Sequence, residues 1–113
     1  MITIYHFNRC SKSRQALAIL EEKEIPFKIR YYIEEPLSTS EILTLQQKLN
    51  VPLKEMIRTN ETEYKEISGE QIPEDSELVQ MLAEHPKLLQ RPIVESSDKA
   101  IIARPPEKLL EVI

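Results

Sequence analysis

This chain of 113 residues has a single cysteine, Cys10, and a single glycine, Gly69, and it has no tryptophan. One cysteine cannot form an intramolecular disulfide, which fits a protein of a reducing compartment. No apolar run approaches the roughly 20 residues that a membrane-spanning helix requires. The first residues also lack the basic stretch followed by a long apolar stretch that marks a secretory signal. We therefore expect a cytoplasmic protein.

Charge and composition narrow the possible classes of function. The chain carries 19 acidic and 15 basic residues, and the net charge of −4 argues against general nucleic-acid binding. A small anionic substrate remains compatible, because a local cluster of arginines can override the net charge. No pair or cluster of histidine, cysteine, aspartate and glutamate has the spacing of metal ligands, so we expect no metal. We also expect no bound cofactor and a monomer.

The first third of the chain predicts a strand, a helix and a second strand. Residues 1–5 are rich in β-branched and aromatic side chains, residues 11–23 carry an apolar face at helical spacing, and residues 27–33 alternate. Pro26 prevents the helix from continuing. This order at this spacing predicts a βαβ unit with parallel strands.

The rest of the chain predicts helices followed by a hairpin. In the segment of about residues 38–90, Ser38 and Glu41 form a capping box for one helix, and Gly69 is placed to end another. Strand character returns at residues 92–95 and 100–103, which predicts a β-hairpin, and a final helix follows.

The order β-α-β, helical segment, β-β-α is that of a thioredoxin-like α/β fold with a mixed sheet. We expect a single domain over residues 1–113 with a helical insertion at about residues 38–90.

Cys10 lies where the first strand should pass into the first helix. The first-turn N–H groups of a helix have no partner within the helix and stabilise a negative charge, so a thiol at this junction ionises readily. His6, Arg9 and Arg14 lie close by in the sequence and can add positive charge. The alternative is an inert cysteine that serves as a small buried apolar residue.

Spacing excludes two familiar cysteine sites. A dithiol redox site needs a second cysteine three residues on, where this chain has Ser13. A phosphatase-type loop would place an arginine six residues after the cysteine, where this chain has Ala16. If Cys10 takes part in a redox reaction, the thiol that resolves it must therefore come from another molecule.

Three arginines are candidates for holding an anionic substrate. Arg58 follows a predicted helix, and Arg91 and Arg104 each precede a proline, which forces the residue before it into an extended conformation. Planar guanidinium groups bind tetrahedral oxyanions through paired hydrogen bonds. The alternative is that these are ordinary surface arginines paired with the abundant glutamates.

Three motifs, in order along nearly the whole chain, resemble the glutaredoxin-coupled arsenate reductases. The first is Tyr5-His6-x-x-x-Cys10-x-x-Ser13-Arg14, the second is Leu-Gln-Arg91-Pro92-Ile93-Val94, and the third is Ala103-Arg104-Pro105. The likeness is strongest to the short bacterial members of that family.

The resemblance implies a thioredoxin-like fold and a mechanism. The Cys10 thiolate would attack arsenate, glutathione would attack the thiolated arsenic, and glutaredoxin would reduce the resulting mixed disulfide as arsenite leaves. In the same family pattern His6 favours the thiolate, and Ser13 and Arg14 orient and activate the sulfur. The resemblance also implies that Arg58, Arg91 and Arg104 hold the oxyanion and that Pro92 is the cis-proline opposite the cysteine.

The chain departs from the family pattern beside the cysteine. The family usually has an Asn-Pro pair directly after the histidine and a glycine after the cysteine, where this chain has Phe7-Asn8 and Ser11. Two other functions remain open. One is a thiol oxidoreductase that uses glutathione without arsenic chemistry. The other is a non-enzymatic relative that binds RNA polymerase, although such regulators usually carry the second cysteine that Ser13 replaces.

Overall fold

The computed structural model describes residues 1–69, 71 and 73–113, which divide into two compact units. The sheet unit contains Met1–Glu35 and Arg91–Ile113, and the helical unit contains Pro36–Gln90. The helical unit corresponds to the insertion predicted at about residues 38–90, of which Glu70 and Ile72 lie outside the described residues. That the two units form a single domain stays a prediction.

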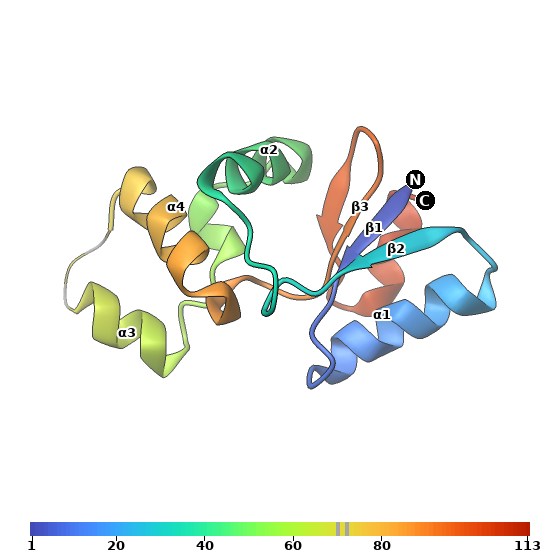
Figure 1. Ribbon diagram of the computed structural model, residues 1–113, viewed down its shortest axis with the longest axis horizontal. Coiled ribbons are helices and arrows are strands. Elements are labelled where there is room, and N and C mark those ends of the chain that lie inside the picture. The colour runs from blue at the N-terminus through green and yellow to red at the C-terminus, as the bar shows by residue number, and fades with distance from the viewer. Residues whose placement is uncertain (70, 72) are drawn as a thin grey trace. The chain divides into compact units, whose positions relative to one another are not determined.

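A four-stranded mixed sheet forms the centre of the sheet unit, with the strand order β2-β1-β3-β4 (Figure 1). The central strand β1 pairs in parallel with β2 and antiparallel with β3, and β3 and β4 form an antiparallel hairpin. The predicted mixed sheet is therefore confirmed. The strands are β1 (Ile2–Tyr5), β2 (Phe27–Arg30), β3 (Ile93–Glu95) and β4 (Ala100–Ile102).

One face of this sheet packs against the helix α1 (Ser11–Glu22) and the 3₁₀ helix η3 (Pro106–Glu111). The apolar spacing of residues 11–23 brings one stripe of α1 onto the strands. This packing fixes both ends of the loop from β1 to α1, which carries Cys10. The buried residues of this core are Ile2, Ile4, Ala16, Leu20, Val94, Ala103 and Leu109.

Two predicted elements of the sheet unit differ from the observed ones. The second strand ends at Arg30 rather than at residue 33, because the N–H of Glu35 donates to the carbonyl of Tyr31 at 2.9 Å and closes a turn. The final helix is a short 3₁₀ helix, in which the N–H of Lys108 donates to the carbonyl of Pro105 at 3.0 Å. Short 3₁₀ segments with bonds three residues apart are common as connectors and chain ends.

The helical unit confirms the predicted helix signals. Ser38 accepts a hydrogen bond from the N–H of Glu41, whose carboxylate accepts one from the N–H of Ser38. Gly69 ends α3 with a φ of 62°. The elements are α2 (Thr39–Leu49), η1 (Leu53–Met56), α3 (Thr62–Ser68), α4 (Asp75–Glu84) and η2 (Pro86–Leu88).

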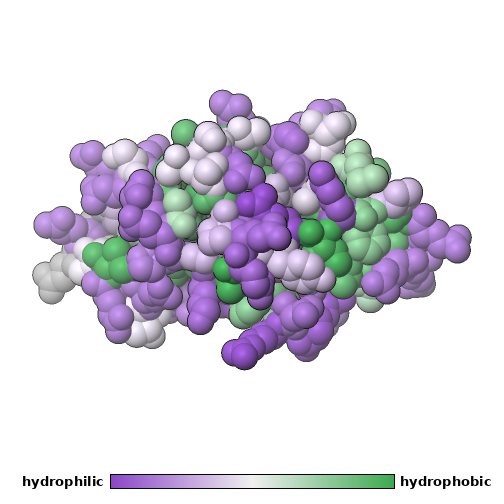
Figure 2. All heavy atoms as spheres, viewed as in Figure 1, coloured by the Kyte–Doolittle hydropathy of each residue, from purple (hydrophilic) through white to green (hydrophobic). Residues whose placement is uncertain are grey.

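Hydrophilic residues cover most of the face shown in Figure 2, and hydrophobic residues are visible in small groups between them. This distribution agrees with a charged-residue content of 30%. None of the helices in the described residues is long and apolar enough to cross a membrane.

Candidate active site

Cys10 lies at the junction of the first strand and the first helix, as the sequence predicts. It is the N-cap residue of α1 and has an extended backbone, with φ −91° and ψ 118°. Its N–H donates to the carbonyl of Phe7 at 3.0 Å, so residues 7–10 form a closed turn. The first turn of α1 contains no acidic residue, so no carboxylate there offsets the positive end of the helix dipole at the sulfur.

The surroundings of Cys10 favour its ionised form. The largest single influence is partial burial, which by itself would raise the pKa of the thiol. The backbone N–H of Ser13, the hydrogen bond and positive charge of Arg91, and the backbone N–H of Lys12 together outweigh it. The pKa of the Cys10 thiol is therefore lowered, which is the condition for a reactive cysteine.

The lowered pKa of Cys10 predicts a pH dependence for its alkylation. Iodoacetamide reacts with the thiolate, so the rate should rise with pH through the pKa of the folded protein. We expect the midpoint of this rise to lie at lower pH in the native protein than in the urea-unfolded protein, which has the same lone cysteine. Equal midpoints in the two states would mean that the fold does not activate Cys10.

His6 and Ser13 form a buried pair next to Cys10. Their exposed fractions are 1% and 0%, and the Nδ1 of His6 lies 2.6 Å from the Oγ of Ser13. The N–H of Phe7 donates to the same Oγ at 3.1 Å, and the Nε2 of His6 lies 2.6 Å from the Oδ1 of Asn8. Both ring nitrogens of His6 thus contact the loop that carries Cys10, while the role predicted for His6 in favouring the thiolate stays a prediction.

Replacement of Ser13 by alanine tests this loop support. The variant leaves two partners of the hydroxyl, the buried imidazole of His6 and the part-buried N–H of Phe7, without their hydrogen bond. An unsatisfied buried polar group costs about 1–3 kcal/mol, so the free energy of unfolding measured in urea should fall by that order. Ser11→Ala, an exposed change in the same helical turn, is the control. Equal losses in the two variants would show that the pair does not support the loop.

Arg14 and Arg9 differ in their surroundings. The Nη1 of Arg14 donates to the carbonyl of Asn8 at 2.7 Å, so this side chain binds the turn that precedes Cys10. Arg9 is exposed, and it is not among the groups that lower the pKa of Cys10. The structure therefore places Arg14 as a support of the turn, while its predicted role in activating the sulfur stays a prediction.

The sheet unit brings Arg91 and Arg104 together. The Nη1 of Arg104 donates to the carbonyl of Arg91 at 2.9 Å, and Arg104 itself is exposed. The guanidinium of Arg91 lies over the ring of Phe7, with its Cζ 4.9 Å from the ring centroid. The peptide bond between Arg91 and Pro92 is cis, the configuration that the resemblance implies, and so is the bond between Arg104 and Pro105.

Arg58 belongs to the helical unit, where it pairs with Glu61. Its Nε and Nη2 lie 3.0 and 2.8 Å from the Oε1 of Glu61. The alternative considered from the sequence, an arginine paired with a neighbouring glutamate, thus describes Arg58 in this structure. Its assignment to the oxyanion stays a prediction.

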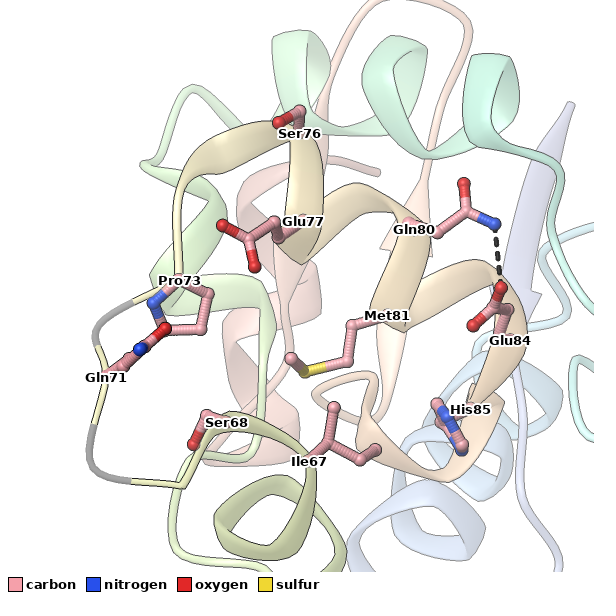
Figure 3. A pocket seen from close by; sticks show the side chains of 10 residues that line it. All are labelled: Ile67, Ser68, Gln71, Pro73, Ser76, Glu77, Gln80, Met81, Glu84 and His85. Atoms are coloured by element: carbon pink, nitrogen blue, oxygen red, sulfur yellow. Dashed lines mark hydrogen bonds between the residues drawn. The ribbon is translucent and has the colours of Figure 1, made fainter.

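A pocket of about 470 Å³ lies in the helical unit between α3 and α4. Figure 3 shows that Ile67 and Met81 line it together with polar side chains, including Gln80, which donates to Glu84 at 2.8 Å. None of the predicted site residues is among the described residues that line this pocket. Within the described residues there is also no group of three histidine, cysteine, aspartate or glutamate side chains placed to hold a metal ion.

Residues 5–112 match the sequence model of the ArsC family. The chain belongs to the ArsC family. An arsenate reductase of Haemophilus influenzae is 39% identical over 99% of this chain and 98% of its own length. The uncharacterized protein YfgD of Escherichia coli (strain K12) is 36% identical over 99% of this chain and 96% of its own length.

Among solved structures, an arsenate reductase from Vibrio cholerae superposes on this ArsC-family chain with a TM-score of 0.95. It is 40% identical, and the match covers 99% of this chain and 97% of that one. The thioredoxin-like α/β fold predicted from the order of the elements is therefore confirmed. Phe7 and Asn8 contact residues of the candidate site, and the sequence alone did not predict these contacts, although both positions depart from the ArsC-family pattern.

Proposed function

We propose that this protein is an arsenate reductase in which Cys10 is the nucleophile and glutathione and glutaredoxin are the external reductants. The observation that carries the proposal is the lone thiol at the start of α1, whose pKa is lowered by two backbone N–H groups and Arg91. ArsC-family relatives named arsenate reductase, which match this chain over nearly their whole length, supply the choice of arsenate.

In the first step the thiolate of Cys10 forms a bond to the arsenic of arsenate. One arsenate oxygen takes up a proton and leaves as water or hydroxide, and the arsenic remains As(V). Arg91 bears positive charge at the sulfur and can stabilise the negative charge on the arsenate oxygens. The resemblance assigns Arg104 and Arg58 to the same oxyanion, which we retain as part of the proposal.

The second step needs a thiol that this chain does not contain, because Cys10 is its only cysteine. Glutathione reacts with the thiolated arsenic, and a sulfur–sulfur bond to Cys10 replaces the sulfur–arsenic bond. The arsenic keeps that electron pair, passes from As(V) to As(III), and leaves as arsenite. A glutaredoxin thiolate then takes the glutathione from the mixed disulfide and restores Cys10.

The supporting residues hold the nucleophile in place. His6 and Ser13 fix the loop through buried and part-buried hydrogen bonds, and Arg14 fixes the turn before Cys10 through an exposed hydrogen bond. We propose that they lower the cost of arranging the sulfur and Arg91 around the oxyanion. This mechanism uses no bound cofactor. It places the protein, as a monomer, in a reducing compartment such as the cytoplasm, which keeps thiols reduced.

Oxidation of NADPH in the presence of glutathione, glutaredoxin and glutathione reductase tests this proposal. We expect the rate to depend on arsenate and to saturate with it. If arsenate has no effect while Cys10 still forms a mixed disulfide with glutathione, the protein is a thiol oxidoreductase of another substrate. If neither occurs, the enzymatic proposal is wrong and a non-enzymatic role is favoured.

A further inference from the structure

We propose that Phe7 is a positioning residue for Arg91. The ring of Phe7 holds the guanidinium of Arg91 beside the sulfur of Cys10. The Cζ of Arg91 lies over the ring, 4.9 Å from its centroid, within the range of a cation–π interaction. The same arginine donates a hydrogen bond to Cys10. Phe7, Arg91 and Cys10 all belong to the sheet unit, so the arrangement is complete within one compact body.

The ring is itself held at a fixed place relative to the nucleophile. The carbonyl of Phe7 accepts the N–H of Cys10 at 3.0 Å, and the N–H of Phe7 donates to the buried hydroxyl of Ser13 at 3.1 Å. Both backbone groups of Phe7 are thus bonded to the segment that contains the sulfur. On the other side, the carbonyl of Arg91 accepts a hydrogen bond from Arg104 at 2.9 Å, which fixes the main chain there.

An aromatic ring suits this task better than a carboxylate. A long arginine side chain has many rotamers, and a partner that selects one of them lowers the entropy lost when the substrate binds. A glutamate would select a rotamer but would also neutralise the charge and occupy N–H donors, as Glu61 does with Arg58. The ring of Phe7 attracts the cation through its face and adds no negative charge.

This assignment gives a role to one of the positions at which the chain departs from its family pattern. It deepens the proposed function, because it rests on Arg91 as a ligand of the oxyanion. The hydrogen bond from Arg91 to Cys10 does not depend on arsenate, however, so part of the effect of Phe7 is measurable without any turnover.

The test compares Phe7→Leu with Phe7→Tyr, and with Phe27→Leu as a matched control. Phe7→Leu keeps an apolar side chain but removes the ring, whereas Phe7→Tyr keeps it. Phe27, the only other phenylalanine, is also half-buried, but it packs against the apolar core of the sheet unit. We expect Phe7→Leu to move the alkylation midpoint of Cys10 to higher pH and to lower kcat/KM for arsenate by about 2- to 30-fold. Phe7→Tyr and Phe27→Leu should stay near the wild type.

A double-mutant cycle separates positioning from simple packing. In an Arg91→Ala background, Phe7→Leu should cause no further change in the alkylation midpoint, because the group that Phe7 positions is gone. Equal effects of Phe7→Leu with and without Arg91, or equal effects of Phe7→Leu and Phe27→Leu, would overturn the inference. Should the wild type fail to reduce arsenate while the cycle still shows coupling, the proposed function falls and the role of Phe7 stands. If the wild type reduces arsenate but the cycle shows no coupling, the proposed function stands and the role of Phe7 falls.

Discussion

Cys10→Ser is expected to lower the arsenate-dependent oxidation of NADPH by about a thousandfold or more, because it removes the nucleophile. A serine hydroxyl is not ionised near neutral pH, so the N–H groups of α1 and Arg91 have no thiolate to stabilise. The chain has no second cysteine that could take over the reaction. The measurement is the initial rate with saturating glutathione, glutaredoxin and glutathione reductase.

The same substitution should leave the fold intact. Cys10 is the N-cap residue of α1 and makes no side-chain capping bond there, and serine is one of the residues preferred at this position. The free energy of unfolding should therefore be equal to or higher than that of the wild type. Ser11→Ala, which changes the next residue and keeps the thiol, is the control for activity. Arsenate reduction by Cys10→Ser at a comparable rate would exclude Cys10 as the nucleophile.

Arg91→Ala is expected to give the second largest loss. It removes a hydrogen bond and a positive charge from the Cys10 sulfur, and both of them lower the pKa of that thiol. Charge-assisted hydrogen bonds contribute about 1.5–3 kcal/mol, so kcat/KM for arsenate should fall by about 10- to 150-fold. The alkylation midpoint of Cys10 should also move to higher pH.

Two arginine variants control for the loss of charge alone. Arg9→Ala removes the same charge from the residue next to Cys10, and Arg9 does not contribute to the lowered pKa. Arg30→Ala removes it from the end of β2, where the Arg30 side chain binds the carbonyl of Glu35 at 2.9 Å. Both should change kcat/KM far less than Arg91→Ala. Similar losses in all three variants would argue against a specific oxyanion ligand at Arg91.

Local signals predicted most of the fold. The capping box of Ser38 and Glu41 and the positive φ of Gly69 act within a few residues, so the sequence alone reveals them. The end of β2 was misplaced, because the apolar residues after Arg30 resemble a strand but form a turn that the backbone bond from Glu35 to Tyr31 closes. The helix type of residues 106–111 also escaped prediction, since the hydrophobic pattern of so short a segment does not separate 3₁₀ from α geometry.

The sequence predicts those parts of the candidate site that depend only on the position of a residue along the chain. A cysteine at the start of a helix follows from the strand and helix patterns on either side of it. The contact between Phe7 and Arg91 was not predictable, because the two residues lie near opposite ends of the sequence and meet only when β3 pairs beside β1. The bond between Asn8 and His6 was missed for another reason: the direction of a side chain within a turn depends on the closed backbone.

Direct measurement of arsenite released from arsenate, with the full glutathione and glutaredoxin system, tests the central claim. Arsenic species separated by chromatography and counted by mass spectrometry report the product itself, independent of NADPH. We predict multiple turnovers of arsenite per molecule of wild-type protein and none above background for Cys10→Ser. Background levels with the folded wild type, while a known arsenate reductase is active in the same mixture, would contradict the proposed reaction.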